Sequence, residues 1–557
     1  MTEFSSQKRT EIKHKMNQES LDLLVIGGGI TGAGIALDAA TRGMKVAVVE
    51  MQDFAAGTSS RSTKLVHGGL RYLKQFEIGV VAEVGKERAI VYENGPHVTT
   101  PEWMMLPFYK GGTFGPFTTN IGLRVYDFLA GVKKSERRKM FKPAEAIERE
   151  PLLNQKGLKG AGYYVEYKTD DARLTIEVLK QAVEKGALAL NYLQVTNLVY
   201  ENHQIVGVEV EDQIDGTSQE IRAKKIVNAA GPWVDTLREK NHSKKGKTLQ
   251  LTKGIHLVFD RSRFPLKQAI YFNTPDGRMV FAIPREGKTY VGTTDTVYKG
   301  DIAHPKMTVE DRDYVLKAID YMFPKVNISP EDVESSWAGL RPLIHEEGKD
   351  PSEISRKDEI FVSDSGLISI AGGKLTGYRK MAESIVDLVA KQLKKEAGKT
   401  YPRSQTEHLP ISGGEVGGSE GFQSFLSNKV LEGKGLGLDK GVAEKLVKRY
   451  GSNVEYIFEI FAKKKEMANV ERLEPVVYAM LRYAMKFELA YKPVDFFIRR
   501  TGALFFDIHW VEQHKEAVIS YMAKVLSWSE EQLQQYTAEL NQLIYEAQHP
   551  VEAGTLQ

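Results

Sequence analysis

Residues 21–50 read LDLLVIGGGITGAGIALDAATRGMKVAVVE, and this stretch decides the fold. An apolar run at 21–26 ends in three glycines, and residues 30–42 then carry alanine, isoleucine and leucine at helical spacing. Gly43 ends that helix, and a second apolar run leads to Glu50. Strand, glycine turn, helix and strand within roughly thirty residues indicate a βαβ unit. Because both strands are apolar apart from Asp22, we expect a parallel sheet that is covered on both faces.

Residues 27–32 fit the pattern GxGxxG at the place where a dinucleotide-binding fold needs it, between strand and helix. Gly27 permits the tight turn, Gly29 lets the backbone approach a pyrophosphate, and Gly32 lets helix and strand pack closely. Ile30 and Thr31 begin the helix, whose N–H groups and positive dipole end attract the phosphates. The alternative, a glycine turn without a ligand, does not explain why an acid ends the next strand.

That acid is Glu50, eighteen residues after Gly32. At this place a carboxylate binds a ribose 2′-OH and repels the 2′-phosphate of NADP. The second strand then runs into DFAAGTSSRSTKLVHGGLRYL, a polar loop rather than another βα unit, and two further glycine turns end strands at 227–233 and 371–376. One nucleotide fold assembled from such distant segments favours a long dinucleotide, FAD, over NAD.

The composition excludes several classes of protein. The chain has 557 residues, 76 basic and 73 acidic side chains, a net charge of +3 and no cysteine. This balance gives no support for nucleic-acid binding, which normally shows as a basic excess. The lack of cysteine excludes disulfides, thiolate metal sites, Cys-ligated iron–sulfur clusters and a cysteine nucleophile. Redox chemistry would therefore need a bound cofactor. No metal site is expected, and His345, Glu346 and Glu347 are interpreted as a solvated loop patch.

No stretch is apolar over the roughly 18 residues that a spanning helix needs. The first twenty residues are polar and mixed in charge, so they do not resemble a secretory signal. We expect a disordered lead-in there, and a cytoplasmic protein that associates peripherally with the inner face of the cell membrane.

The chain divides by pattern into an α/β core, a β-rich domain and a helical end. Residues 172–187 predict an amphipathic helix and 189–227 a β-meander, whereas 255–295 are rich in strands. A Gly/Ser-rich stretch at 411–421 suggests a linker or surface loop. Helices are expected at 378–395, 442–450, 454–462, 475–487 and 529–547, the last with a capping box of Ser529 and Gln532.

The predicted fold is an FAD-binding Rossmann-like core with an interleaved β-rich substrate domain and an all-α C-terminal domain. The expected segments are a lead-in (1–20), FAD-binding parts (21–90, 161–240, 341–400), substrate parts (91–160, 241–340) and a helical domain (401–557).

Several motifs together resemble one known family, the FAD-dependent glycerol-3-phosphate dehydrogenases, within the class of flavoproteins that includes D-amino-acid oxidase. The motifs are IGGGITGAGIALDAATRG, TSSRSTKLVHGGLRYL, TDDARL, AAGPWVD, KGIHLV, VGTTDTVYKGD, AGLRPL and AGGKLTGYRKMAE, in order over residues 21–385. The glycine fingerprint alone marks a superfamily, whereas HGGLRYL, GTTD and GGKLTGYR are more specific. The resemblance implies oxidation of sn-glycerol 3-phosphate to dihydroxyacetone phosphate, with hydride transfer from C2 to FAD N5 and electrons passed to membrane quinone.

The resemblance also implies residues for the substrate. Those expected at the substrate are Arg71, Tyr72, His256, Arg341, Arg356 and Lys374. An arginine fits a phosphate bidentately, which suits Arg341 as an anion clamp, although most arginines are surface residues. An imidazole suits a general base, which makes His256 one candidate. A single histidine at the start of a strand is more often structural, and Lys374 is the competing candidate.

For the cofactor, the resemblance implies contacts along much of the chain. Beyond the glycine turn and Glu50, these are Thr58, Ser59, Lys64, Leu65, His67, Gly68, Gly69, Val195, Ala230, Gly231, Trp233, Gly373, Lys374, Leu375 and Thr376. We expect His67 to hydrogen-bond near the isoalloxazine and not to carry a covalent flavin.

Other partners follow from the same function. Delivery to quinone requires surface contact with a membrane, and residues 101–134 combine aromatic, methionine and basic residues that suit an interface. A buried edge of the substrate domain is the favoured alternative for this segment. The C-terminal helices either form a homodimer interface or cover the core. The rival functions are a glycerol-3-phosphate oxidase that uses oxygen and a non-catalytic flavin-binding sensor.

Overall fold

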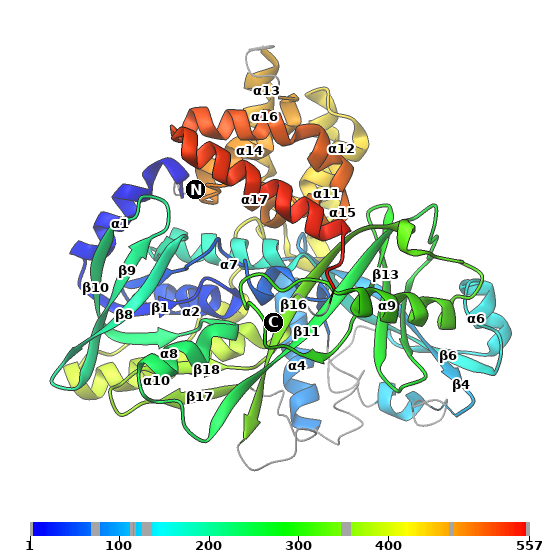
Figure 1. Ribbon diagram of the computed structural model, residues 1–557, viewed down its shortest axis with the longest axis horizontal. Coiled ribbons are helices and arrows are strands. Elements are labelled where there is room, and N and C mark those ends of the chain that lie inside the picture. Colours follow the sequence, from blue (N-terminus) through cyan, green and yellow to red (C-terminus); the bar gives the residue numbers. More distant parts are fainter. Residues whose placement is uncertain are drawn as a thin grey trace.

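The computed structural model describes residues 4–67, 78–111, 115, 119–124, 136–346, 358–466 and 473–552. It confirms the predicted class, because a Rossmann-like sheet and a larger β-rich sheet lie side by side, with a group of helices above both (Figure 1).

The first sheet is the nucleotide-binding one, and its parallel core has the order β18-β10-β1-β2-β7. All residues of β1 and β2 are buried, as continuous apolar strands predict. The predicted meander is confirmed as β8, β9 and the first half of β10, which pair antiparallel before β10 joins β1. The strands are β1 (Leu21–Ile26), β2 (Val46–Val49), β7 (Leu188–Leu190), β8 (Leu193–Glu201), β9 (Gln204–Asp212), β10 (Ser218–Asn228), β17 (Glu359–Val362) and β18 (Ile368–Ala371).

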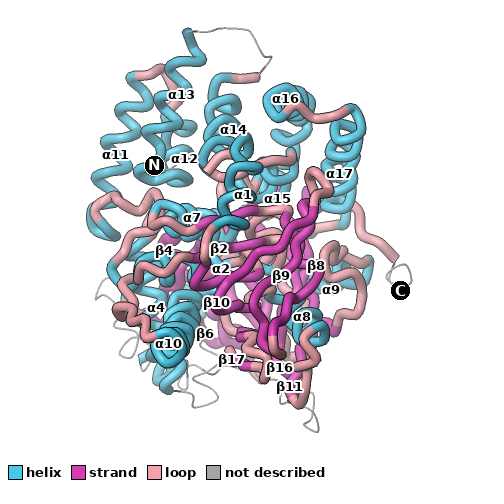
Figure 2. The backbone as a smooth tube through the Cα atoms, turned by 90° about the vertical axis from the view of Figure 1, so that its left-hand side faces the viewer, coloured by secondary structure: helices cyan, strands magenta, loops and turns pink. Residues whose placement is uncertain are grey.

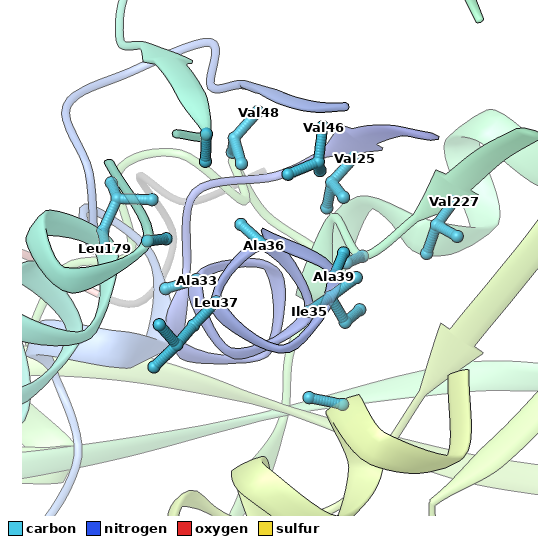
Figure 3. Packing of buried hydrophobic residues seen from close by; sticks show 14 of the residues in the cluster. Val25, Ala33, Ile35, Ala36, Leu37, Ala39, Val46, Val48, Leu179 and Val227 are labelled. Carbon is cyan, nitrogen blue, oxygen red and sulfur yellow. The ribbon is translucent and has the colours of Figure 1, made fainter. Parts of the chain in front are cut away.

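Helix α2 (Ile30–Thr41) is almost wholly buried against this sheet, between α7 (Asp171–Glu184) and α10 (Tyr378–Ala397). Figure 3 shows its alanines and Leu37 close to Val25, Val46 and Val48 of the strands and to Leu179 of α7. Small residues allow these close approaches, and a Cβ at Gly34 would lie 3.0 Å from the ring of Tyr378.

The second sheet carries the substrate-domain segments in the order β15-β11-β14-β13-β12-β4-β6-β3, with β16 beside β11 and β5 beside β6. Strands β6 and β16 run across the predicted boundaries at 160 and 340, because the hydrogen-bonded ladders continue there without a break. These segments therefore extend further than predicted. The strands are β3 (Leu65–Val66), β4 (Thr99–Tyr109), β5 (Lys139–Phe141), β6 (Leu158–Thr169), β11 (Lys247–Asp260), β12 (Ala269–Asn273), β13 (Met279–Arg285), β14 (Lys288–Gly292), β15 (Thr296–Val297) and β16 (Val333–Glu346). Further helices around the two sheets are α4 (Ile78–Asn94), α6 (Pro143–Arg149), α8 (Val234–Lys240) and α9 (Val309–Met322).

The C-terminal domain is helical, as predicted, and both views place it above the two sheets (Figures 1 and 2). The predicted bounds 475–487 are those of α14, and Ser529 and Gln532 form the predicted capping box. The helices are α11 (Gly418–Gly435), α12 (Lys440–Tyr450), α13 (Val454–Glu466), α14 (Pro475–Phe487), α15 (Ala503–Phe506), α16 (Ile508–Leu526) and α17 (Glu530–Gln548), with a π-helical turn over Asp495–Arg500.

The predicted disordered lead-in is wrong for the residues described. Helix α1 (Arg9–Gln18) lies against the meander, and Phe4 and Met16 are buried. Lys13 Nζ donates to Asp212 and Asp215 at 3.0 and 2.5 Å. The sequence lacks an apolar stripe here because paired charges hold much of this helix in place.

The predicted linker at 411–421 is not a surface loop. Ile411 and Val416 are buried, and Gly413 has a φ of +77°. A Cβ at Gly413 would lie 2.6 Å from the carbonyl oxygen of Tyr450. The glycines therefore permit close packing between domains.

The candidate membrane segment 101–134 is described only in part. Its first residues belong to β4, which pairs on both edges, and Met104, Met105, Leu106 and Phe108 are buried. This part agrees with the buried alternative, while 112–114, 116–118 and 125–134 lie outside the described residues. Within the described ranges, every helix is too short or too polar to cross a membrane.

Candidate active site

The glycine turn after β1 has the geometry that a dinucleotide cradle needs. Gly27 has a φ of +113°, and a Cβ there would lie 2.5 Å from the carbonyl oxygen of Ala229. A Cβ at Gly32 would overlap the carbonyl oxygen of Gly27, so Gly32 is the contact that lets α2 pack against the turn. The first N–H of α2, that of Ile30, donates to Ser59 Oγ at 2.9 Å. The N-terminus of α2 and the hydroxyl group of Ser59 are therefore in contact beside the glycine turn.

A cavity of about 560 Å³ opens beside this turn, within the size range of about 300–1,000 Å³ that is usual for ligand pockets. It draws residues from all three predicted FAD-binding segments, and its lining residues run from Ile26 to Leu375 along the chain. Of the predicted cofactor residues, those on its wall are Gly27, Gly29, Ile30, Thr31, Glu50, Thr58, Ser59, Val195, Ala230, Gly231, Trp233, Gly373, Lys374 and Leu375. The glycine cradle, the helix N-terminus and the distant segments fit an extended dinucleotide such as FAD.

Glu50 lies at one end of this cavity. Its Oε2 accepts from the N–H of Gly28 at 2.7 Å, and its Oε1 accepts from the N–H of Gln52 at 2.8 Å. Burial raises the pKa of the Glu50 carboxyl above its ordinary value, and these two hydrogen bonds oppose the rise. The carboxylate is therefore held in one orientation at the cavity wall.

Other predicted residues lie behind the wall or outside the described residues. Thr376 Oγ1 donates to the carbonyl oxygen of His67 at 3.2 Å, which joins two of the predicted cofactor segments. Leu65 pairs with Lys168 in the substrate sheet. The residues on which nothing is described are Gly68, Gly69, Arg71, Tyr72 and Arg356.

His256 is buried in β11 and does not line the cavity. Its ring stacks on Trp337 with a centroid distance of 4.7 Å, and its Nε2 lies 3.1 Å from Thr63 Oγ1. Its Nδ1 has no hydrogen-bond partner among the described residues. Burial, with the positive charges of Arg341 and Lys64, lowers the pKa of the imidazole well below its ordinary range. The lowered pKa favours the neutral form of the ring.

Arg341 lies on strand β16, which pairs with β11. Its side chain is on the same face of the sheet as that of His256. Its guanidinium donates to Thr293 Oγ1 at 2.9 Å, to the carbonyl oxygen of Thr294 at 3.1 Å and to Asp295 at 3.2 Å. The side chain is 30% exposed, so it is held in place yet reachable from solvent. A Cβ at Gly254 would overlap the guanidinium, so that glycine leaves the room for it.

Sequence reasoning missed a buried ion pair behind the cavity. Lys64 Nζ donates to Asp171 Oδ1 at 2.6 Å, and Ser62 donates to Oδ2 from both its N–H and its hydroxyl. Asp171 and Ser62 line the cavity, and Lys64 lies 5.3 Å from the ring centre of Trp337. The two adjacent acids of TDDARL at the start of an amphipathic helix were the signal for Asp171.

A second, more open cleft of about 1250 Å³ lies between residues 296–306 and α17. It contains none of the predicted site residues, so its larger size does not make it the site. His345 and Glu346 lie in β16 and not in a loop as predicted, and Glu347 is outside the described residues. Within the described part of the chain, no three His, Asp or Glu side chains are placed to hold a metal ion.

Comparison with known proteins agrees with this geometry. A family model described as FAD dependent oxidoreductase matches residues 22–379, and one described as C-terminal domain of alpha-glycerophosphate oxidase matches residues 404–533. An aerobic glycerol-3-phosphate dehydrogenase of Bacillus subtilis is 64% identical over 99% of both chains, and one of Staphylococcus aureus is 60% identical over 98% of both.

Among solved structures, the glycerol-3-phosphate dehydrogenase of Bacillus halodurans complexed with FAD superposes with a TM-score of 0.86. It is 51% identical, and the match covers 98% of this chain and 99% of that one. Both family models, the near full-length relatives and the dinucleotide cradle at the glycine turn agree. The chain belongs to the family of FAD-dependent, aerobic glycerol-3-phosphate dehydrogenases.

Proposed function

We propose that this protein oxidises sn-glycerol 3-phosphate to dihydroxyacetone phosphate by hydride transfer from C2 to FAD N5 and passes the electrons to a membrane quinone. The observation that carries the proposal is the cavity built from three distant FAD-binding segments, with Lys374 on its wall. The substrate is proposed from the relatives, which are named for glycerol 3-phosphate and align over nearly the whole chain.

Residues of this chain carry out the remaining steps, which are substrate binding and proton removal. When bound, FAD supplies the acceptor for the hydride. Arg341 binds the phosphate dianion, because its planar fork is fixed by Thr293 and Thr294 and stays charged at all working pH values. Arg71, Tyr72 and Arg356 are proposed to complete the substrate contacts.

Two residues compete for the proton of the C2 hydroxyl. His256 has an unpartnered Nδ1 among the described residues, but its lowered pKa makes it a weak base. Lys374 lies on the cavity wall and supplies a charge that can stabilise a developing alkoxide. We assign the base role to His256 and the electrostatic role to Lys374, and single-turnover kinetics of His256→Ala test this division.

The first experiment is anaerobic mixing of the FAD-loaded protein with glycerol 3-phosphate. Bleaching of the flavin absorbance is expected, and glycerol serves as the matched control because it lacks only the phosphate. If glycerol 3-phosphate leaves the flavin oxidised, both the dehydrogenase and the oxidase are excluded for this substrate, and a non-catalytic flavoprotein remains.

An oxidase is the second candidate, because the C-terminal family model is described for an alpha-glycerophosphate oxidase. The chemistry on the substrate is the same and only the acceptor differs. Reoxidation of the reduced flavin in air with stoichiometric peroxide would favour the oxidase. Fast reoxidation by a soluble quinone with little peroxide is expected for the dehydrogenase.

Transfer to a membrane quinone requires peripheral contact with the inner face of the membrane. Co-sedimentation with anionic lipid vesicles tests this, and binding that is lost at high salt is expected for a contact with basic residues. Sedimentation velocity separates a homodimer formed through the C-terminal helices from a monomer.

A further inference from the structure

Among the described residues, none from the C-terminal domain lines the cavity, yet two of its arginines bind Asp53 in the loop after β2, and neighbours of Asp53 do line it. We propose that Arg499 and Arg500 are positioning residues for FAD, which they hold through Asp53. Docking of the C-terminal domain and binding of FAD are then coupled. The inference requires only that the cavity holds FAD, and it is independent of the substrate.

The loop after β2 is the part of the cavity that is positioned. Glu50, Met51, Gln52 and Ala56 line the cavity. The loop is tied to its surroundings by backbone hydrogen bonds, including one from the N–H of Tyr192 to the carbonyl oxygen of Gln52 at 2.8 Å. Any shift of this loop therefore moves both the Glu50 carboxylate and the cavity wall.

Asp53 is the anchor of this loop, and its side chain is completely buried. Arg500 binds it bidentately, with Nη1 donating to Oδ2 at 2.6 Å and Nη2 donating to Oδ1 at 2.9 Å. Arg499 Nε donates to the same Oδ2, and Asn191 donates to Oδ1 at 2.8 Å. Burial opposes ionisation, but the two guanidinium groups hold the pKa of Asp53 well below its ordinary range.

The same two guanidinium groups also donate hydrogen bonds within the C-terminal domain. Arg500 Nη2 donates to the carbonyl oxygen of Glu488 at 2.6 Å, and Arg499 Nη2 donates to Asp495 at 2.7 Å. The π-helical turn places the two neighbouring arginines so that both reach Asp53. The loop after β2 therefore has its position defined by a domain that begins more than 300 residues later.

A second connection runs from the same domain to another element of the cavity wall, helix α7. Glu488 binds Arg173 of α7 through both carboxylate oxygens. Arg173 also donates to the carbonyl oxygen of Arg500 at 3.0 Å. Helix α7 begins with Asp171, which lines the cavity and holds Lys64. The domain thus contacts two elements of the cavity wall through one cluster of buried charges.

Helix α1 joins the same anchor. Arg9 Nη1 donates to Asn191 Oδ1 at 2.6 Å, and the amide of Asn191 donates to Asp53. Removing one partner from a buried ion pair leaves an unpaired buried charge, which costs free energy. The cluster is therefore most stable when all of its partners are in place. Because coupling between two sites is reciprocal, a ligand that needs this arrangement also stabilises the docked domain.

The first test measures how fast FAD leaves the diluted holoenzyme, by the rise in flavin fluorescence, and the FAD dissociation constant on rebinding. Arg500→Met and Asp53→Asn are expected to weaken FAD binding about 5- to 150-fold, the usual range of coupling between sites. Arg500→Lys should fall between Arg500→Met and the unchanged protein, because it keeps the charge and loses the bidentate geometry.

The matched control is Glu166→Gln. Glu166 pairs with Arg88 at 3.1 Å, is as deeply buried as Asp53, and does not line the cavity. The control is expected to lower the unfolding temperature and leave FAD release unchanged. If a folded Arg500→Met protein lost stability but bound FAD with unchanged affinity, the arginine would be structural only and the proposal would be overturned.

The second test needs no substitution. Hydrogen exchange is compared in the holoenzyme and in the full chain after removal of FAD. Backbone amides of 488–506 are expected to exchange more slowly with FAD bound, and more so than those of α13 in the same domain. Equal exchange of 488–506 in the two forms would overturn the proposal.

Discussion

His256 Nε2 lies 3.1 Å from Oγ1 of Thr63, so strand β11 is joined to the loop that leads into the predicted cofactor motif. The other ring nitrogen, Nδ1, is buried and has no hydrogen-bond partner among the described residues. Removing the imidazole would therefore remove a candidate base and also the contact that joins β11 to Thr63.

His256→Ala is expected to lower the rate of flavin reduction by about 10²- to 10⁴-fold, the usual contribution of a general base. The dissociation constant of glycerol 3-phosphate should change much less, and stopped-flow single turnovers measure both. His256→Gln is the control for position, because its amide can still reach Thr63. If only the dissociation constant rises, the base role passes to Lys374.

Arg341→Ala is expected to weaken binding of the phosphorylated substrate by roughly 10- to 150-fold, since a hydrogen bond to a charged group contributes about 1.5–3 kcal/mol. Gly254→Ala should have a smaller effect in the same direction, because its Cβ would displace the guanidinium. Steady-state KM values for glycerol 3-phosphate measure both. An unchanged KM in Arg341→Ala would show that another cation binds the phosphate.

Gly32→Ala is expected to abolish FAD binding, because the new methyl group would overlap the carbonyl oxygen of Gly27 and separate α2 from the turn. The flavin content of the purified variant, read from its absorbance, measures this. Gly435→Ala is the matched control, since a Cβ there meets nothing within 4 Å. Normal flavin content in Gly32→Ala would mean that the turn tolerates a wider separation.

The burial of His97 predicts that the protein becomes less stable in acid. Its ring is buried, neither nitrogen has a hydrogen-bond partner among the described residues, and burial, with Arg173 and Lys180, lowers its pKa from 6.5 to about 3. Below pH 6.5 the unfolded chain binds a proton that the folded chain does not. The free energy of unfolding should therefore fall as pH decreases from 6.5 towards 3, by up to about 1.4 kcal/mol per unit from this group.

His97→Leu should reduce that slope, as measured by urea unfolding at several pH values. Some slope remains because His256 also has a lowered pKa. Parallel curves for His97→Leu and the unchanged protein would contradict the assignment.

The glycine turn and its packing contact could be predicted from the sequence because their signals are local. The turn at Gly27, the packing contact at Gly32 and the acid at Glu50 each depend on neighbours within about thirty residues. Their positions on one cavity wall then follow from strand order, since the carboxyl ends of parallel strands meet at one edge.

The rest could not be predicted because it depends on pairs far apart in the chain. Arg500 and Asp53 are 447 positions apart, and no periodic pattern links them. The ordered N-terminal helix was missed for the same reason, since Lys13 binds acids about 200 positions later. Burial of His256 behind Trp337 likewise depends on the pairing of β11 with β16.

The N-terminal segment also bears on the order in which the molecule is completed. Ser6 Oγ donates to the carbonyl oxygen of Ala490 at 2.6 Å, across 484 positions, and the N–H of Leu489 donates to the carbonyl oxygen of Phe4. During synthesis the first residues emerge long before their partners exist. The contacts between residues 4–6 and residues 489–490 can therefore form only after residue 490 has been synthesised.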